Sequence, residues 1–473
     1  MTGLPPLTAH DMATGVRAGR LDPGDLVETA LDRAEAIAPL NAFTAIDREG
    51  ALAAARHVEE RLAAGEGGTM PLAGVPVAIK DFTPTAGLAC TRGSWSTGDR
   101  LADRDPAVIA RLKRAGAILV GRTTTPEFAY SSFTQSPRWG VTRNPHDPAR
   151  TPGGSSGGSA VAVATGCVPL AEGSDMGGSV RIPAALSGVV GVKPSLGLIP
   201  MDILPCGPDL MSHFGPLAAC VDDAALFLAA TAGPDAADYF SQSRPDVPTS
   251  PVPPAPPGTR IALSIDLGYY AVDPGVARQV EQAAERLRGH GMTVEPVPLR
   301  WTRDINDAWL MQWAVALAAN WGTALDTHRD RMDPALVALM ETGRDCDAVA
   351  LVRLGAVRER LWRDLAEVFE HYDALICPTC ATTAPPVSMS DADFEVTAPD
   401  GRFAGLDLAC PFNLVSACPA VSVPIGRSEG LPVGLQIVAP RFRDAVALGI
   451  AKSVEACFPP EAVVETIRER DLT

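Results

Sequence analysis

Runs of apolar residues along the chain predict helices and strands that alternate in sequence. Residues 7–18 and 23–37 carry apolar side chains at spacings of three and four, which is the pattern of helices with one buried face. Residues 75–79 instead carry β-branched residues at alternate positions, and this short predicted strand ends at Lys80. A strand, a helix and a second strand are expected within residues 260–297. This alternation predicts an α/β fold with a central mixed β-sheet covered by helices on both faces.

Further predicted elements extend the same pattern to the C-terminus. We expect helices at 49–64, 107–115, 159–165, 221–232 and 445–457, a long helical region at 303–370, and strands at 118–120, 168–171, 372–376, 420–423 and 434–438. Residues 244–258 differ, because seven prolines in fifteen positions remove backbone donors. That segment is expected to be a solvated, Pro-rich surface connection.

The composition is typical of a globular protein and argues against several classes of function. The chain has 473 residues, of which 46% are hydrophobic and 20% charged, enough for a sizeable core. Its formal charge of −16 and the lack of a basic block disfavour nucleic-acid binding. No apolar run approaches the ~20 residues of a membrane span, and residues 1–11 do not resemble a secretory signal. Ten scattered cysteines are too sparse for a disulfide scaffold, so we expect a reduced, cytoplasmic protein.

Two clusters rich in glycine and serine are the strongest candidates for chemistry. The first is GGSSGG at residues 153–158, and the second is SDMGGSVR at residues 174–181. Glycines beside a serine allow another molecule to approach the main chain, and successive N–H groups could converge on a developing oxyanion. A flexible turn is an alternative for either cluster alone, but two clusters flanking one short helix and strand favour a catalytic site.

Two common catalytic or binding motifs do not explain these clusters. Residues 153–157 fit G-x-S-x-G, but a nucleophile elbow follows an apolar strand, and residues 144–152 contain three prolines instead. Neither cluster supplies the G-x-x-x-x-G-K-[ST] pattern of a phosphate-binding loop.

The two clusters and their surroundings resemble the amidase signature family. The segments that carry the resemblance are GGSSGGSAVAVATG (153–166), GSDMGGSVRIPAALSGVVGVKPSLG (173–197), GVPVAIKD (74–81), GLACTRGS (87–94), TTTPEFAYSSF (123–133), GPLAACVDDAAL (215–226), ALICPT (374–379), PAVSVPIG (419–426) and GLPVGLQIV (430–438). They follow the family order over most of the chain. The resemblance implies a single amidase-signature domain over residues 1–473, with a signature core at about 70–230 and a variable substrate-pocket region at about 300–370.

The resemblance also implies a catalytic triad and the residues around it. The family nucleophile falls on Ser179, the lysine on Lys80, and the bridging serine on Ser155, which would follow a cis peptide bond from Gly154. The expected oxyanion hole consists of the main-chain N–H groups of Met176, Gly177, Gly178 and Ser179, and the expected supporting residues are Ser156, Ser174, Asp175 and Arg181.

Acid–base chemistry supports the assignment of Lys80. A serine hydroxyl needs a neighbouring base to become a nucleophile. None of the seven histidines lies in a catalytic context, and His146 and His213 are interpreted as loop or core residues. Lysine acts as a base only when neutral, and lowering its pKa from ~10.4 to near 7 requires roughly 4.6 kcal/mol, which burial can supply. Without the motifs, a solvated lysine at a strand end would be the favoured interpretation.

Aromatic residues supply candidates for the substrate pocket. Two tryptophans of the variable region share a helix face, although a helix facing the core is an equal alternative. The candidate lining residues are Phe128, Tyr130, Trp139, Trp309 and Trp313.

These features predict an amidohydrolase that cleaves the C–N bond of a small amide, aryl amide or carbamate through an acyl-enzyme. No metal or cofactor is expected; Cys377 and Cys380 form a C-x-x-C, but no second Cys or His pair has complementary spacing. The resemblance allows a homodimer. One alternative is the glutaminase subunit of a tRNA-dependent amidotransferase, which typically has Gln where this chain has Ile182. The other is a catalytically silent binding protein on the same scaffold.

Overall fold

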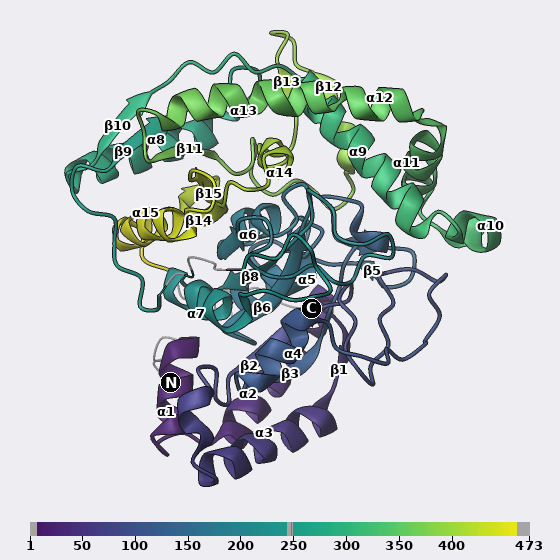
Figure 1. Cartoon of the computed structure of the whole chain (residues 1–473), viewed down its shortest axis with the longest axis vertical. Helices are drawn as coiled ribbons and strands as arrows, with labels where there is room; N and C mark the ends of the chain where they lie inside the picture. The colour runs from purple at the N-terminus through teal and green to yellow at the C-terminus, as the bar shows by residue number, and fades with distance from the viewer. Residues whose placement is uncertain (1–6, 244–246, 248, 461–473) are drawn as a thin grey trace.

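The computed structural model describes residues 7–243, 247 and 249–460, and one sheet of eleven strands runs through it (Figure 1). In sheet order the strands are β1 (Phe43–Ile46), β3 (Ile118–Thr123), β2 (Pro76–Lys80), β6 (Leu170–Asp175), β8 (His213–Ala218), β7 (Val190–Lys193), β14 (Ala420–Ser428), β15 (Leu431–Val438), β11 (Ala374–Pro378), β9 (Arg260–Leu263) and β10 (Thr293–Pro296). β2 is parallel to β3 and β6, whereas β8 is antiparallel to β6 and β7. The predicted α/β fold with a central mixed sheet is confirmed.

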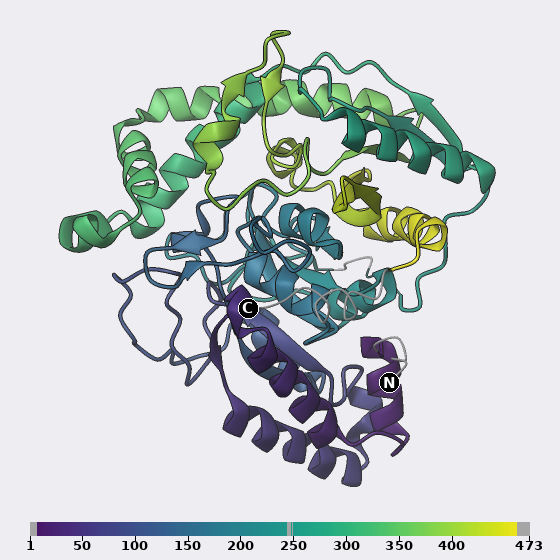
Figure 2. The same ribbon diagram turned by 180° about the vertical axis from the view of Figure 1, so that it is seen from behind.

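Helices cover both faces of this sheet (Figures 1 and 2). They are α1 (Ala9–Arg17), α2 (Pro23–Ala36), α3 (Arg48–Ala63), α4 (Ala107–Arg114), α5 (Gly157–Ala164), α6 (Arg181–Ser187), α7 (Val221–Thr231), α8 (Pro274–Gly289), α9 (Asp304–Trp321), α10 (Ala324–His328), α11 (Pro334–Asp345), α12 (Ala348–Arg353), α13 (Gly355–Phe369), α14 (Pro411–Leu414) and α15 (Asp444–Cys457). Two small hairpins pair β4 (Gln135–Ser136) with β5 (Gly140–Val141) and β12 (Val396–Thr397) with β13 (Phe403–Ala404).

Alternating side chains along β2 show which helices share a face of the sheet. Val77 and Ile79 pack in a cluster with residues of α4, α7, α8 and α15. Ala78 packs in a second cluster with residues of α2, α3, α5 and α6. Successive side chains of a strand point to opposite faces, so these two groups of helices form the two outer layers.

The helical region predicted at 303–370 is divided into five helices, α9 to α13. Asp333 caps α11 by accepting a hydrogen bond from the N–H of Ala335, and Pro334 occupies the first helical position. Asp347 caps α12 in the same way, through the N–H groups of Val349 and Ala350. A capping aspartate favours the start of a new helix, and a proline cannot continue the previous one.

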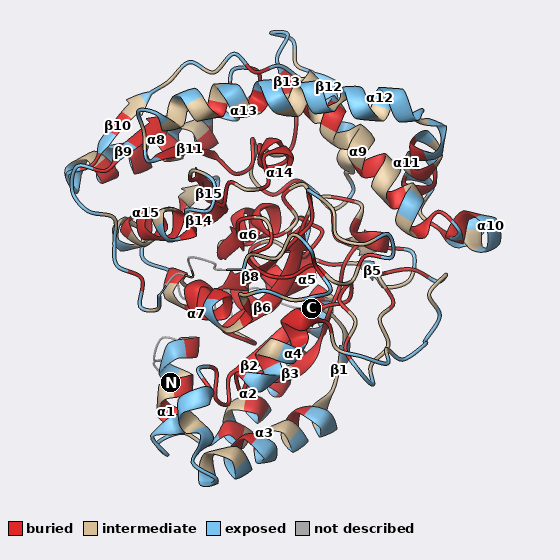
Figure 3. Cartoon of the chain, viewed as in Figure 1, coloured by how far each residue is buried: buried red, intermediate tan, exposed pale blue. Residues whose placement is uncertain are grey.

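Every residue of α5 and α6 is buried (Figure 3). At the other extreme, no residue of α12 is buried. Residues 249–258 of the Pro-rich segment form neither helix nor strand, and the N–H of Ala255 donates to the carbonyl of Gly449 in α15. Residues 244–246 and 248 of that segment, like residues 461–473, lie outside the described residues. Among the helices that the structure describes, none has the length and apolar character needed to span a membrane.

Candidate functional site

The structure brings Lys80 and Ser155 into contact, although they are far apart in sequence. Lys80 is the last residue of β2, and Ser155 precedes the N-terminus of α5. The Nζ atom of Lys80 donates to Ser155 Oγ at 2.6 Å and to Ser174 Oγ at 2.9 Å. The peptide bond between Gly154 and Ser155 is cis. One buried amine therefore touches one hydroxyl from each Gly/Ser cluster.

The surroundings of Lys80 disfavour its charged form. The residue is fully buried, and burial lowers its pKa from 10.5 to about 7, against the opposing charges of Glu172 and Asp175. Glu172 is also fully buried and accepts hydrogen bonds from the N–H of Lys80 (3.0 Å) and from Thr83 Oγ1 (2.8 Å). Burial raises the pKa of Glu172 as well. A substantial fraction of Lys80 is therefore uncharged near neutral pH.

The second cluster spans the turn between β6 and α6 and faces the first cluster. Ser179 lies in this turn, is partly exposed, and lines the same small cavity as Ser155 and Ser174. The N–H of Ser156 donates to the carbonyl of Ser179 at 3.1 Å. The Oγ atom of Ser156 donates to the carbonyl of Ser174 at 3.3 Å. These two bonds hold the clusters in a fixed relative position.

Asp175 and Arg181 brace this turn from inside the protein. The carboxylate of Asp175 accepts hydrogen bonds from the N–H groups of Gly178 (2.9 Å) and Val180 (3.2 Å). Arg181 is fully buried and donates to both oxygens of Asp175 through Nε and Nη2. Burial alone would raise the pKa of Asp175, but the charge and hydrogen bonds of Arg181 hold it below its usual value. The turn is therefore preorganised by a buried ion pair.

The remaining donors of Arg181 reach the C-terminal half of the chain. They contact the side-chain oxygens of Gln436 and Asn413, both at 2.6 Å, and the carbonyl of Ala409 at 2.9 Å. Sequence reasoning missed Glu172, Asn413 and Gln436. For Glu172 a signal exists, because a charged residue directly after the apolar residues 168–171 of a predicted strand needs partners in the interior.

The main-chain N–H groups of the turn differ in their availability. The N–H of Gly178 is bound to Asp175, so in this arrangement it does not point at an incoming ligand. Among the described residues no acceptor is found for the N–H groups of Met176, Gly177 and Ser179. Gly178 has a φ of +122°, and a Cβ built on it would lie 2.6 Å from the Cβ of Ala409, so glycine is required at this point.

Two neighbouring cavities adjoin the turn. The cavity that contains Ser155 and Ser179 has about 20 Å³, room for one water molecule, and its apolar walls include Phe82, Trp313 and Trp321. A larger cavity of about 310 Å³ shares Trp313 with it and reaches Gly177. A carbonyl group would fit the first cavity, and the rest of a small molecule the second.

Three of the five predicted pocket residues line these cavities. Trp309 and Trp313 of α9 and Tyr130 line the larger one. The indole N–H of Trp309 donates to the carbonyl of Met176 (2.8 Å), and that of Trp313 to the carbonyl of Tyr130 (3.2 Å). A Cβ on Gly177 would lie 2.1 Å from the Trp309 ring, so this indole packs directly on the turn.

Phe128 and Trp139 do not line either cavity. Phe128 is buried and its ring stacks on Trp321 with centroids 5.4 Å apart, so it supports a cavity wall from behind. The indole N–H of Trp139 donates to Thr91 Oγ1 at 2.8 Å, and the guanidinium of Arg138 lies over its ring.

The histidines and the C-x-x-C pair have other surroundings. His213 is buried on β8 and borders the small cavity, with Nδ1 at 2.8 Å from the carbonyl of Met211. Burial lowers the pKa of His213 to about 3. His146 is buried in a loop, with Nε2 at 2.9 Å from the carbonyl of Ser187. Burial raises the pKa of both Cys377 and Cys380. Within the part of the chain that the structure describes, no three His, Cys, Asp or Glu side chains gather as a metal site.

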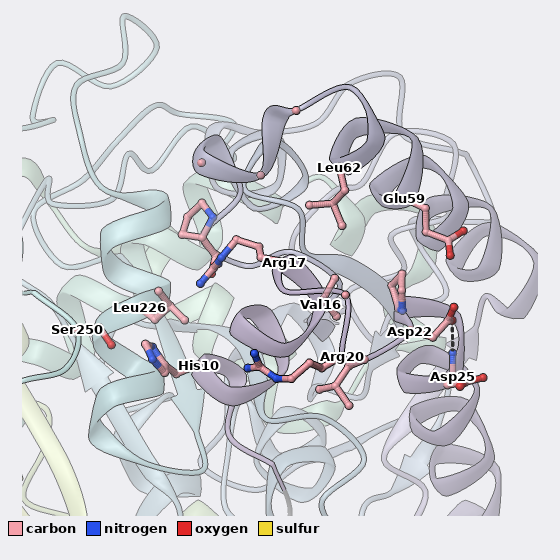
Figure 4. A pocket seen from close by; sticks show the side chains of 17 residues that line it. His10, Val16, Arg17, Arg20, Asp22, Asp25, Glu59, Leu62, Leu226 and Ser250 are labelled. Atoms are coloured by element: carbon pink, nitrogen blue, oxygen red, sulfur yellow. Dashed lines mark hydrogen bonds between the residues drawn. The ribbon is translucent and has the colours of Figure 1, made fainter.

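A still larger cavity of about 1070 Å³ lies against α1, α2 and α3, at the opposite end of the molecule from α13 (Figures 1 and 4). Its walls carry charged side chains such as Arg17, Arg20 and Glu59, which Figure 4 shows around the opening. No serine–lysine pair lies among its described lining residues. Volume alone therefore does not identify the functional site of this protein.

Comparisons with known proteins agree with the fold and relate nearly the whole chain to amidases. The family model named Amidase matches residues 25–448. The chain is 35% identical over 460 residues to an acylamidase of Rhodococcus erythropolis, with 96% of each chain covered. It is 36% identical over 483 residues to a glutamyl-tRNA(Gln) amidotransferase subunit of Acidothermus cellulolyticus, covering 95% of this chain and 94% of the relative.

Solved structures of amidases share the fold of this chain. The crystal structure of a bacterial aryl acylamidase of the amidase signature enzymes superposes with a TM-score of 0.90 at 26% identity, covering 99% of both chains. The structure of a 6-aminohexanoate cyclic dimer hydrolase complexed with substrate superposes with a TM-score of 0.83 at 28% identity, covering 97% of this chain and 99% of the other.

Proposed function

The chain belongs to the amidase family of hydrolases that act on carbon–nitrogen bonds, and within it we propose an acyl-enzyme amidase for small amides, aryl amides or carbamates. Ser179 is the proposed nucleophile, Ser155 the bridging hydroxyl and Lys80 the base. The observation that carries this proposal is the 2.6 Å contact between Lys80 Nζ and Ser155 Oγ in a fully buried environment. Such an amine can be neutral near pH 7, where a solvated lysine is charged.

The proposed reaction moves one proton along two hydroxyls. Neutral Lys80 takes the proton of Ser155 while Ser155 takes that of Ser179, and Ser179 Oγ forms a bond to the substrate carbonyl carbon. The carbonyl oxygen becomes an oxyanion, for which the uncommitted N–H groups of Met176, Gly177 and Ser179 are the proposed donors. The ammonium of Lys80 then returns its proton through Ser155 to the leaving nitrogen as the C–N bond breaks. Water repeats the sequence on the acyl-enzyme and releases the acid.

The test compares Ser179→Ala with Ser187→Ala on a chromogenic, uncharged aryl amide. Ser187 is a buried serine of α6 whose hydroxyl donates to the carbonyl of Pro152, so it is a matched control outside the proposed site. We expect Ser179→Ala to lower kcat/KM by at least ~10³, and Ser187→Ala to retain most of the activity. Mass spectrometry of the quenched reaction should find the acyl group on the peptide that contains Ser179. A Ser179→Ala enzyme with more than a few per cent of wild-type activity contradicts the proposal.

A second candidate function is supported by the amidotransferase relatives, which would make glutamine the substrate and other protein chains the partners. Two observations disfavour it. The position after Arg181 is Ile182, and no Lys or Arg side chain among the described residues lines either cavity to pair with the carboxylate of glutamine. Assaying the purified chain alone with glutamine and with an aryl amide separates the two functions. Labelling by a fluorophosphonate probe, absent in Ser179→Ala, separates both from a silent binding protein.

A further inference from the structure

The larger cavity beside the catalytic turn has acidic walls. Three carboxyl side chains line it, those of Asp391, Glu395 and Asp407, and no Lys, Arg or His side chain does so among the described residues. We propose that this cavity selects amide substrates that carry a protonated amine, with Asp407 as the main partner of the ammonium group. This inference rests on the proposed function, because it assigns the cavity to the substrate of Ser179.

Asp407 lines the same cavity as Gly177 of the catalytic turn. It precedes Ala409 by two residues, and the Cβ of Ala409 lies 2.6 Å from the position that a Cβ on Gly178 would take. The carbonyl of Ala409 also accepts a hydrogen bond from Arg181, which braces the same turn. A substrate whose carbonyl lies at Ser179 would therefore extend past Gly177 into the cavity that Asp407 also lines.

Asp407 differs from the other two carboxyl groups in how its oxygens are bound. Asp391 is already engaged, because it accepts hydrogen bonds from Ser131 Oγ (2.6 Å) and from the N–H of Ser132 (3.2 Å). Glu395 is exposed at the rim. Asp407 accepts one bond through Oδ1 from the N–H of Ala409 (2.8 Å), and its Oδ2 has no hydrogen-bond partner among the described residues. Asp407 therefore has an oxygen left for a ligand.

The charges of Arg181 and Arg303 lower the pKa of Asp407 and of Glu395 respectively, but neither arginine lines the cavity. Arg181 already donates hydrogen bonds to Asp175, Asn413, Gln436 and the Ala409 carbonyl. The Arg303 guanidinium lies 4.8 Å from the Phe403 ring centroid and donates to the Glu395 carbonyl at the rim.

Burial raises the pKa of Asp407 to about 7, partly offset by the Ala409 N–H and the charge of Arg181. An ammonium group in the cavity would favour the ionised form of this carboxyl and would itself be bound more strongly as that form increases. The negative charges of Asp391 and Asp175 raise the pKa of Asp407 further and so disfavour its ionised form.

The remaining walls suit an amine attached to an apolar or aromatic body. The aromatic side chains among them are Tyr130, Trp309, Trp313, Phe394 and Phe403. Aromatic faces attract ammonium groups as well as aryl rings. An anionic substrate would meet three carboxyl groups and no Lys, Arg or His side chain among the described lining residues, so the same walls disfavour it.

The experiment compares matched anilides with the wild-type enzyme. One set varies the ring of acetanilide with para-aminomethyl, para-hydroxymethyl or para-carboxymethyl groups. A second set varies the acyl side with 6-aminohexanoyl and hexanoyl anilides. In at least one set we expect the cationic substrate to exceed the neutral one by about tenfold or more in kcat/KM, as for a charge-assisted hydrogen bond, with the carboxymethyl substrate the poorest.

Asp407→Asn should reduce the cationic-to-neutral ratio of kcat/KM by about tenfold. Asp393→Asn is the control, because Asp393 is exposed, lies in sequence between the lining residues Asp391 and Glu395, and does not itself line the cavity. Its carboxylate accepts a hydrogen bond from the N–H of Ser390. This control should leave the ratio unchanged. Equal rates for cationic and neutral substrates in both sets, or an unchanged ratio in Asp407→Asn, overturn the inference. Failure of the proposed function gives a different result, since then even the neutral anilides would be cleaved independently of Ser179 or not at all.

Discussion

Replacing Lys80 by methionine tests whether a buried, uncharged amine drives the reaction, and Lys193 provides a matched control. Both lysines are fully buried, and burial lowers the pKa of each to about 7. Lys80 contacts the hydroxyls of Ser155 and Ser174, whereas Lys193 donates to the main-chain carbonyls of residues 194, 416 and 418. The two substitutions therefore remove the same kind of amine, but only the first removes contact with the serines of the site.

The lowered pKa sets the size of the expected effect. A fall from 10.5 to about 7 for Lys80 corresponds to roughly 5 kcal/mol of destabilised charge, so roughly half of this amine is neutral at pH 7, against about one in 3,000 for a solvated lysine. We expect Lys80→Met to lower kcat/KM for a neutral aryl amide by ~10³ or more, at the upper end for a general base. Lys193→Met, once folded, should stay within about fivefold of wild type.

The pH dependence of activity follows from the same value. Below pH 7 protonation of Lys80 removes the base, so kcat/KM should fall about tenfold per pH unit, and this acid limb should persist in Lys193→Met. The measurement is kcat/KM between pH 5 and 10 for the wild type and both variants. A Lys80→Met enzyme that keeps a tenth of the wild-type rate, or a wild-type profile that is flat between pH 5 and 8, refutes the reasoning.

Stability provides a readout that both lysine variants share. The folded-state pKa of each lysine is below its unfolded value, so the unfolded chain binds more protons between pH 7 and 10.5 and stability rises with pH across that window. Each lysine contributes a slope of up to about 1.4 kcal/mol per pH unit. In urea unfolding at pH 7, 8 and 9, the free energy of unfolding of each variant should therefore rise less steeply with pH than that of the wild type. If both lysine variants change the free energy of unfolding in the same way but only Lys80→Met loses activity, the loss of activity comes from catalysis and not from packing.

Two further predictions concern neighbours of the site. Trp309→Phe removes the hydrogen bond to the Met176 carbonyl, worth about 1 kcal/mol, and should lower kcat about three- to tenfold with a smaller change in KM; steady-state kinetics with unchanged kcat would contradict this. Glu172→Gln keeps an acceptor for the N–H of Lys80 but removes a negative charge that raises the Lys80 pKa. The acid limb of the kcat/KM profile of Glu172→Gln should therefore lie about half a pH unit or more below that of the wild type. A limb that stays in place or moves to higher pH would disprove the effect of Glu172 on the Lys80 pKa.

Much of the fold was predictable because its signals are local. The alternation of apolar residues in 75–79 marks β2 and places Lys80 at its end, since side chains two apart share a face of a strand. The Gly/Ser clusters indicated candidate loops for the same reason, through backbone freedom read from neighbouring residues. The breaks in the region 303–370 were also encoded locally, by Asp-Pro and Asp caps that the apolar pattern alone did not separate.

The surroundings of the site depended on tertiary structure. Sequence indicated that a base was needed, but the burial of Lys80, which lowers its pKa, results from packing of segments far along the chain. Arg181 contacts Asn413 and Gln436, more than 200 residues away, and Asp407 lines the same cavity as Gly177, 230 residues before it. Periodicity reports on residues a few positions apart, whereas the charge state of a buried group depends on everything that excludes water from it. The sequence thus determined the elements and the candidate residues, and only the folded chain decided their electrostatics and the acidic lining of the larger cavity.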